Sequence, residues 1–204
     1  MLGWLWMLGW RRQWDGLLPA GLFCFLPERP PDRGEPSMAE RFAIRVGKEL
    51  LCFRACHFLV FGPESAEPIH EHMYRMAVEF AAPLDPHGMV ADFTWVQPAL
   101  QRLVQQLDHR ILLAGEDPRL QIRPTGDQLE VHLGPNRWEF PRSQCLLLPL
   151  WATTTELLAR YLAQRILTLC QAQRHWLPER LQVELEESPG LSALVTVQPI
   201  PADR

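Results

Sequence analysis

Two histidines, His70 and His72, stand at alternate positions in the segment IHEHMYR. Alternate residues of a β-strand point to the same face, so a strand here would present both imidazoles together. A third histidine, His57, ends the segment CFRACH, which also has strand character. If the two strands pair as a hairpin, the three imidazoles converge into the ligand set of a catalytic zinc site, with one position left open. The alternative is three cross-strand histidines whose ring nitrogens are satisfied by hydrogen bonds.

Further polar groups stand near the expected ends of elements. Asp108 and His109 directly follow a predicted helix, where such a pair is usually a cap or a turn. Glu186 and Glu187 are neighbours in a predicted strand near the end of the chain. Because adjacent strand residues face opposite sides, one of these two carboxylates points inward unless the strand edge is solvated.

Alternating polarity predicts the strands that carry the histidines, over about 42–60 and 69–81. The second of them presents one face built from His70, His72, Tyr74, Met76, Val78 and Phe80. A helix is predicted over 93–107, provided that Pro98 lies in its first turn. Its apolar stripe consists of Val96, Leu100, Leu103, Val104 and Leu107.

The second half of the chain is also predicted to contain strands and a helix. Three short strands are predicted over 119–123, 128–133 and 137–141, separated by the turns PTGD and GPN. A second helix begins at TTTELLA, where Thr153 and Glu156 form a capping box. Two strands, LQVELEE and SALVTV, close the chain. This order predicts an α+β fold, an antiparallel sheet with two helices on one face.

The composition limits the classes of function. The chain has 204 residues, 47% of them hydrophobic, which fits one domain with a sizeable core. A net charge of -4 gives no basic footprint for nucleic acid, and no run of eighteen apolar residues suggests a membrane span. Five cysteines without C-x-x-C spacing argue against a disulfide framework and a cysteine zinc site. A reducing, cytoplasmic setting fits best.

The first 37 residues differ from the remainder in composition. They hold four of the eight tryptophans and end in the Pro-rich segment LPERPPDRGEPS. The arginines follow the apolar run, unlike those of a signal peptide. We therefore expect residues 1–37 to be a disordered or artefactual extension, and residues 38–204 to be the functional domain. The alternative is an arm that touches a membrane.

Six motifs occur in one order along the chain: FRACH, IHEHMYR, HGMVADF, LDHRILL, TTTELLA and VELEES. From about Phe42 to Val197, the chain resembles the 6-pyruvoyltetrahydropterin synthase and 6-carboxytetrahydropterin synthase family. The resemblance implies a tunnelling fold, in which sheets of several subunits close into an oligomeric barrel. It also implies a homohexamer built from two trimers, in which each subunit binds one zinc ion through His57, His70 and His72.

The same resemblance implies the residues that handle the substrate. Glu187 would hold the guanidine-like edge of a pterin through two parallel N–H bonds. Thr154 and Thr155 would lie near the ring. Asp108 would orient His109 for proton transfer.

Two positions depart from the family pattern. Glu71 replaces the glycine between the paired histidines, and a strand residue there points away from the metal. The cysteine that precedes the histidine pair is absent, and Glu67 stands three residues before His70. This resembles the branch in which a glutamate replaces the cysteine as base. Glu64 is a second candidate, and a solvated loop carboxylate is the alternative for Glu67.

The function implied is that of a zinc-dependent pterin lyase acting on dihydroneopterin triphosphate. We expect 6-carboxytetrahydropterin as the product, which feeds queuosine and 7-deazaguanine synthesis. The alternatives are a 6-pyruvoyltetrahydropterin synthase, an aldolase that cleaves the side chain, and a catalytically silent homologue that binds zinc and pterin. The insert over about 114–148 either extends the barrel wall or covers the active site.

Overall fold

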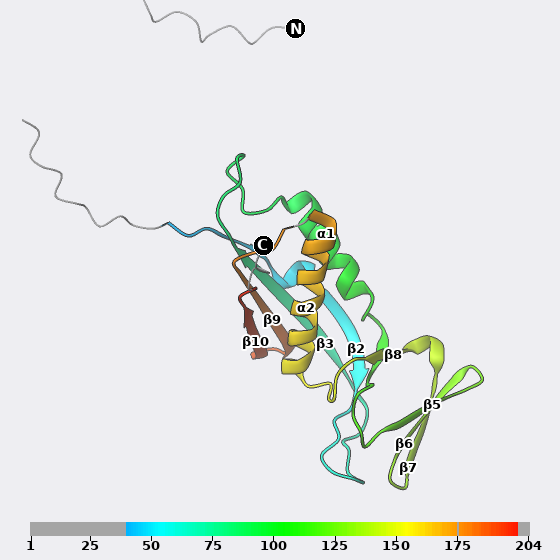
Figure 1. Cartoon of the computed structure of the whole chain (residues 1–204). Helices are drawn as coiled ribbons and strands as arrows, with labels where there is room; N and C mark the ends of the chain where they lie inside the picture. The colour runs from blue at the N-terminus through cyan, green and yellow to red at the C-terminus, as the bar shows by residue number, and fades with distance from the viewer. Residues whose placement is uncertain (1–39, 175, 200–204) are drawn as a thin grey trace, which may run out of the picture. The chain divides into compact units, whose positions relative to one another are not determined.

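The computed structural model describes residues 40–174 and 176–199 (Figure 1). The predicted extension over residues 1–37 and its boundary lie outside the described residues. No helix within the described part combines the length and apolar character needed to cross a bilayer.

A seven-stranded sheet forms the centre of the fold, with the order β10-β9-β3-β2-β4-β8 and β1 paired to β3. The strands are β1 (Ala43–Val46), β2 (Cys52–His57), β3 (His70–Ala81), β4 (Arg110–Ala114), β8 (Cys145–Leu148), β9 (Arg180–Ser188) and β10 (Leu191–Val197). A short 3-10 helix, Lys48–Leu50, separates β1 from β2. The predicted antiparallel sheet is confirmed for β10, β9, β3, β2 and β1.

Two parallel pairs, β2 with β4 and β4 with β8, extend this sheet. The sequence pattern does not predict them, because RILLA and CLLL are short apolar runs without alternation. In such runs, periodicity cannot distinguish a buried strand from a piece of helix. The sheet is therefore mixed rather than purely antiparallel.

Both long helices, α1 (Phe93–Gln105) and α2 (Thr155–Arg174), lie across the same face of the sheet, as predicted (Figure 1). The Asp92 side chain caps α1 by accepting from the Thr94 backbone N–H at 2.8 Å. The prediction that Pro98 lies in the first turn is wrong, because α1 begins at Phe93 and Pro98 is its sixth residue. Its missing N–H leaves the carbonyl of Thr94, an exposed residue, free to face water.

The start of α2 also differs from the predicted capping box. The helix begins at Thr155, so Thr154 is its cap, and the Thr154 hydroxyl accepts from the Leu157 backbone N–H at 3.4 Å. Thr153 lies one residue before the cap and is buried, with 1% of its surface exposed. This shift of one residue frees Thr153 for contacts with the site described below.

The main core lies between the sheet and the helices. The inward face of β3 contributes Tyr74, Met76, Val78 and Phe80, none more than 1% exposed. Leu158 and Leu162 of α2 pack against this face in the same cluster and are fully buried. Burying each such side chain stabilises the fold by about 1.5–3 kcal/mol. The predicted inward face of β3 is thereby confirmed.

The predicted insert is a separate three-stranded antiparallel sheet, β5 (Gln121–Thr125), β6 (Gln128–Leu133) and β7 (Asn136–Pro141). A second 3-10 helix, Arg142–Gln144, leads from β7 into β8. Alternation in β6 buries Leu129, Val131 and Leu133 and leaves the residues between them half-buried. The insert therefore has one apolar face and one polar face.

Candidate active site

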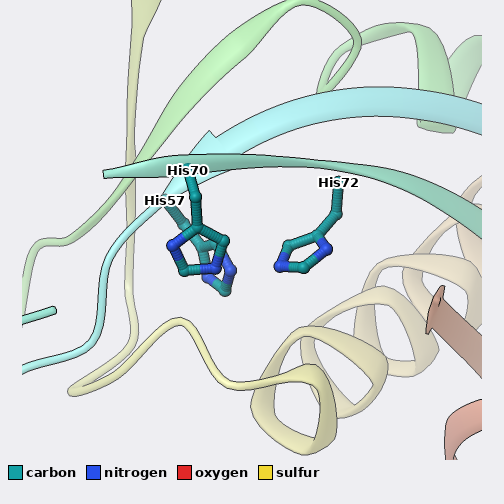
Figure 2. A group of neighbouring side chains, drawn as sticks. All are labelled: His57, His70 and His72. Carbon is teal, nitrogen blue, oxygen red and sulfur yellow. The ribbon is translucent and has the colours of Figure 1, made fainter. Parts of the chain in front are cut away.

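Three imidazoles meet on the helix-covered face of the hairpin β2–β3 (Figure 2). In the register, His57 is opposite His70, and Ala55 is opposite His72. The ring of His57 lies 4.7 Å from that of His70 and 5.2 Å from that of His72, centre to centre. One ring nitrogen of each histidine lies within 4.8 Å of the others, so these three residues could hold one metal ion. The predicted convergence of the three imidazoles is therefore confirmed.

Backbone carbonyls orient two of the rings. His57 Nδ1 lies 2.9 Å from the Thr153 carbonyl oxygen, and His70 Nδ1 lies 2.9 Å from that of Pro68. A carbonyl only accepts, so each Nδ1 carries the proton and each Nε2 keeps a lone pair. Histidines that ligate metals usually donate their other N–H in this way. The donor chemistry of the cluster therefore fits a metal such as zinc.

His57 is almost fully buried, with 1% of its surface exposed. Burial lowers its pKa below the ordinary value, the neighbouring His70 and His72 act in the same direction, and the Thr153 and Glu187 contacts oppose them. A lowered pKa keeps the imidazole neutral at pH 7, and only the neutral form binds a metal.

Glu187, at the end of β9, points into the histidine cluster. Its Oε1 lies 3.3 Å from His57 Nε2 and 3.2 Å from His72 Nε2. Since His57 Nε2 keeps a lone pair, that nitrogen and the carboxylate oxygen are two acceptors facing each other. A cation near both atoms would stabilise this arrangement, which again fits a metal at the cluster.

Hydrogen bonds from two neighbours fix the Glu187 carboxylate. The Thr155 hydroxyl donates to Oε2 at 2.9 Å, and the Tyr74 hydroxyl donates to Oε1 at 3.4 Å. Tyr74 is fully buried, and its hydroxyl also lies 3.4 Å from His57 Nε2. Burial, then the Glu187 charge, raises the Tyr74 pKa far above its ordinary value, so the hydroxyl stays a donor.

The three threonines before α2 have different contacts. Of the two predicted to lie near the substrate, Thr155 contacts Glu187, whereas Thr154 caps the helix. The Thr153 hydroxyl donates to the Phe58 carbonyl at 3.3 Å, and its own carbonyl accepts from His57. Sequence reasoning assigned no site role to Thr153 or Tyr74. For Tyr74 a signal existed, because it shares a strand face with His70 and His72.

The opposite face of the same strands carries charged side chains. Glu71, between the paired histidines, forms an ion pair with Arg54 at 3.3 Å and points away from the cluster, as expected. Glu186 lies 2.6 Å from Lys48 and 3.3 Å from Arg75. Its pKa is held below the ordinary value, first by Lys48 and then by Arg75. Of the two adjacent glutamates, only Glu187 therefore faces the histidines.

Glu67 lies beside the cluster, on the connection between β2 and β3. Its Oε1 accepts from the Leu59 backbone N–H at 2.8 Å and lies 3.9 Å from His70 Nδ1. The Glu67 backbone N–H donates to the Leu59 carbonyl at 3.0 Å, which closes the base of the loop. Glu64, the second candidate base, is exposed nearer the tip of this loop. The structure therefore places Glu67, but not Glu64, next to the metal-ligand candidates.

Asp108 and His109 form a pair directly before β4. His109 Nδ1 lies 2.8 Å from an Asp108 oxygen, and Asp108 accepts from the Arg54 backbone N–H at 2.8 Å. That amide, then His109, holds the Asp108 pKa below its ordinary value. His109 has a φ of +56°, in the left-handed region, and its side chain is 75% exposed. Among the described residues, no hydrogen bond or ion pair links this pair to the three histidines.

Comparison with known proteins relates this chain to pterin enzymes. The family described as 6-pyruvoyl tetrahydropterin synthase matches residues 47–197. A Pyrococcus horikoshii protein, provisionally named a 6-carboxy-5,6,7,8-tetrahydropterin synthase, is 30% identical over 115 residues, 56% of this chain and 68% of its own length. A Methanocaldococcus jannaschii protein with the same provisional name is 26% identical over 117 residues, 57% of this chain and 71% of its own.

Solved structures have the same fold. The 6-pyruvoyl tetrahydropterin synthase of Plasmodium vivax superposes with a TM-score of 0.73 at 21% identity, over 78% of this chain and 99% of that one. The Plasmodium falciparum enzyme gives 0.70 at 19% identity over the same shares. Further P. vivax structures carry substitutions of a glutamate described as a catalytic residue. The subunit fold predicted from the resemblance is thereby confirmed, and the oligomeric barrel stays a prediction. Since the family match covers most of the chain, including the three histidines and Glu187, the chain belongs to the 6-pyruvoyl tetrahydropterin synthase family of enzymes.

Proposed function

We propose that this protein is a zinc-dependent pterin lyase that converts dihydroneopterin triphosphate to 6-carboxytetrahydropterin, on the route to queuosine and other 7-deazaguanines. The observation that carries the proposal is the convergence of three imidazoles and the Glu187 carboxylate on one side of the hairpin β2–β3. It unites a ligand set for zinc with an acceptor for the pterin ring. The names of the archaeal relatives support 6-carboxytetrahydropterin as the product.

In this proposal His57, His70 and His72 hold the zinc ion through their Nε2 atoms. When bound, zinc supplies Lewis acidity that makes the side-chain hydroxyls of the substrate easier to deprotonate. The carbonyls of Thr153 and Pro68 keep two of the rings in the tautomer that such binding requires.

Glu187 holds the pterin in this proposal, with Thr155 as its support. A carboxylate accepts two parallel N–H bonds from the guanidine-like edge of the ring, which fixes the orientation of the ring in its plane. The Thr155 hydroxyl, 2.9 Å from Oε2, holds the carboxylate in one rotamer. Thr154 serves the site indirectly, since it fixes the start of the helix that carries Thr155.

Glu67 is the proposed general base in place of the family cysteine. Its Oε1 is held by the Leu59 N–H, which leaves Oε2 to accept a proton from the substrate. Its position 3.9 Å from His70 brings it to the metal-ligand candidates without making it a ligand. The catalytic glutamate described for the P. vivax structures supports a carboxylate in this role.

Asp108 and His109 complete the proton-transfer apparatus in the oligomer. The His109 ring is exposed, so we place it at a subunit interface, where it can reach the cluster of a neighbouring subunit. The edge strand β10 supports such an assembly, because its Leu191 and Leu194 are 67% and 60% exposed. An open edge with exposed apolar side chains is a typical site for strand pairing with another chain. We propose a homohexamer of two trimers in the cytoplasm, where the four described free cysteines stay reduced.

The deciding experiment is a product assay. Zinc-loaded protein is incubated with dihydroneopterin triphosphate, and the products are identified by mass spectrometry. The proposal expects 6-carboxytetrahydropterin, and a matched sample of the His72→Ala variant should give none. Formation of 6-pyruvoyltetrahydropterin or of a ring product without its side chain would assign the alternative synthase or aldolase activity. An inert wild type that still binds zinc and pterin would identify a silent homologue.

A further inference from the structure

The insert β5–β7 packs against the loop that carries Glu67. Its inward side chains belong to an apolar cluster separate from the main core, centred on Leu129 and Val131 of β6 together with Phe58 and Leu113. Val60 and Ala66, near the base of the Glu67 loop, pack into the same cluster. The insert therefore adds little to the main core and instead supports the connection between the two histidine strands.

An aromatic stack forms the first contact. Phe58 directly follows the ligand candidate His57, and its ring stacks on Trp138 of β7 with the ring centres 5.1 Å apart. Such aromatic pairs stabilise a fold by more than the burial of their apolar area alone would. Phe58 is 6% exposed, so Trp138 and its neighbours hold it in place from the insert side.

The second contact holds the tip of the loop. The Asn136 side-chain amide donates to the Glu64 carbonyl at 2.9 Å. Gly134, with a φ of +55°, passes so close that an added Cβ would lie 2.8 Å from Glu64 Cγ and 3.2 Å from the Pro63 carbonyl. The turn between β6 and β7 is thus fitted to the backbone of the loop.

These two contacts hold both ends of the loop segment that positions the proposed base, Glu67. Leu59 follows Phe58, and its N–H donates to Glu67 Oε1, while the Val60–Ala66 bridge and the Glu67–Leu59 bond close the loop. Whatever fixes residues 58–60 therefore also fixes the carboxylate. A displacement of about 1 Å can cost roughly 10²-fold in rate.

We propose that the insert is a positioning platform for Glu67, with Trp138 and Asn136 as its positioning residues. The inference rests on the proposed function for its catalytic part and on the contacts above for its structural part. It gives the insert a role other than extending a barrel wall or covering the site.

The kinetic test uses the zinc-loaded enzyme and dihydroneopterin triphosphate. Trp138→Leu keeps an apolar side chain but loses the stack, and kcat should fall roughly 10- to 100-fold with KM and zinc content unchanged. Trp138→Phe, which can still stack, should recover most of the rate. In the Glu67→Gln background, adding Trp138→Leu should not lower kcat any further. The control is Arg123→Ala, a change on the polar face of the insert, which should leave kcat at the wild-type value.

A purely structural role for Trp138 would lower the rate equally in both backgrounds, and that result would overturn the inference. So would a Trp138→Leu enzyme with wild-type kcat.

A second test needs no activity and separates this inference from the proposed function. Asn136→Ala, a change at the half-buried first residue of β7, should speed hydrogen exchange at the Leu59 and Glu67 amides about 2- to 10-fold. Exchange at His72 and along β6 should stay at wild-type rates. Unchanged exchange at Leu59 and Glu67 would refute the platform even if the enzyme is active. If the wild type converts no dihydropterin, the proposed function fails and this measurement alone decides the structural inference.

Discussion

Replacing Glu187 by glutamine should weaken pterin binding while leaving the metal site intact. The glutamine keeps one oxygen for the Thr155 hydroxyl, so the side chain retains its shape and its support. It loses the negative charge and one of the two acceptors needed for the pterin edge. A hydrogen bond to a charged group contributes about 1.5–3 kcal/mol. The dissociation constant should therefore rise about 10- to 150-fold.

Glu186 provides a matched control for this substitution. It is the preceding residue of the same strand, but its carboxylate contacts Lys48 and Arg75 on the opposite face of the sheet. Glu186→Gln removes the same charge and should leave the affinity for pterin unchanged. The effect on stability should also be small, because ion pairs near the surface contribute little to the free energy of unfolding.

The assay is a calorimetric titration of each zinc-loaded protein with neopterin, which has no triphosphate to lose. Zinc content is measured in parallel, since Glu187 Oε1 lies 3.2–3.3 Å from two histidine nitrogens. Three imidazoles remain in Glu187→Gln, so the metal should be retained. Wild-type affinity in Glu187→Gln, or an equal loss in Glu186→Gln, would refute the assignment of the pterin anchor.

Further substitutions and a truncation test the other parts of the site and chain. His72→Ala should lose its zinc on dialysis, and elemental analysis that finds full occupancy would reject the three-histidine site. Glu67→Gln should lose on the order of 10²–10⁴-fold in turnover while zinc and pterin still bind. Glu64→Gln is its control, and the reverse outcome would move the base to Glu64. The pKa of His57 is lower in the folded chain than in the unfolded chain, so as the pH falls below about 6.5 this imidazole takes up a proton more readily in the unfolded chain. The free energy of unfolding of the metal-free protein, measured by urea denaturation, should therefore fall as the pH is lowered from about 7.5 to 5.5. His57→Gln should reduce this dependence on pH. A shortened chain that starts at Met38 should keep its melting temperature and oligomeric state, and a clear loss of either would show that residues 1–37 contribute to the fold.

The metal-ligand geometry was predictable because it follows from local periodicity. A period of two places His70 and His72 on one face without knowledge of the remainder of the chain. The hairpin that adds His57 needs only a short connection between two strands. The same local rules predict the helices and the three strands of the insert, since each has its own pattern of apolar residues.

Other features could not be predicted, because local patterns do not show which strands become neighbours. β4 and β8 join the sheet through parallel pairing across long sequence separations, and their short apolar runs carry no period. Pro98 is tolerated beyond the first turn of α1, although propensity argues against it. The carbonyl it leaves free belongs to Thr94, which is exposed, so the hydrogen bond that Pro98 cannot donate is tolerated there.

For the site itself, the sequence by itself determined that His57, His70 and His72 could converge, and that one of Glu186 and Glu187 faces inward unless the strand edge is solvated. Only the tertiary structure decided which glutamate that is, because the choice depends on how β9 pairs with β3 and which face α2 covers. The same holds for Glu67, whose place beside His70 is set by the bond to Leu59 and by the insert packed behind Phe58. A strand pattern fixes the direction of a side chain relative to its neighbours in sequence. The groups it meets are fixed by contacts between residues far apart in the chain, which no local pattern encodes.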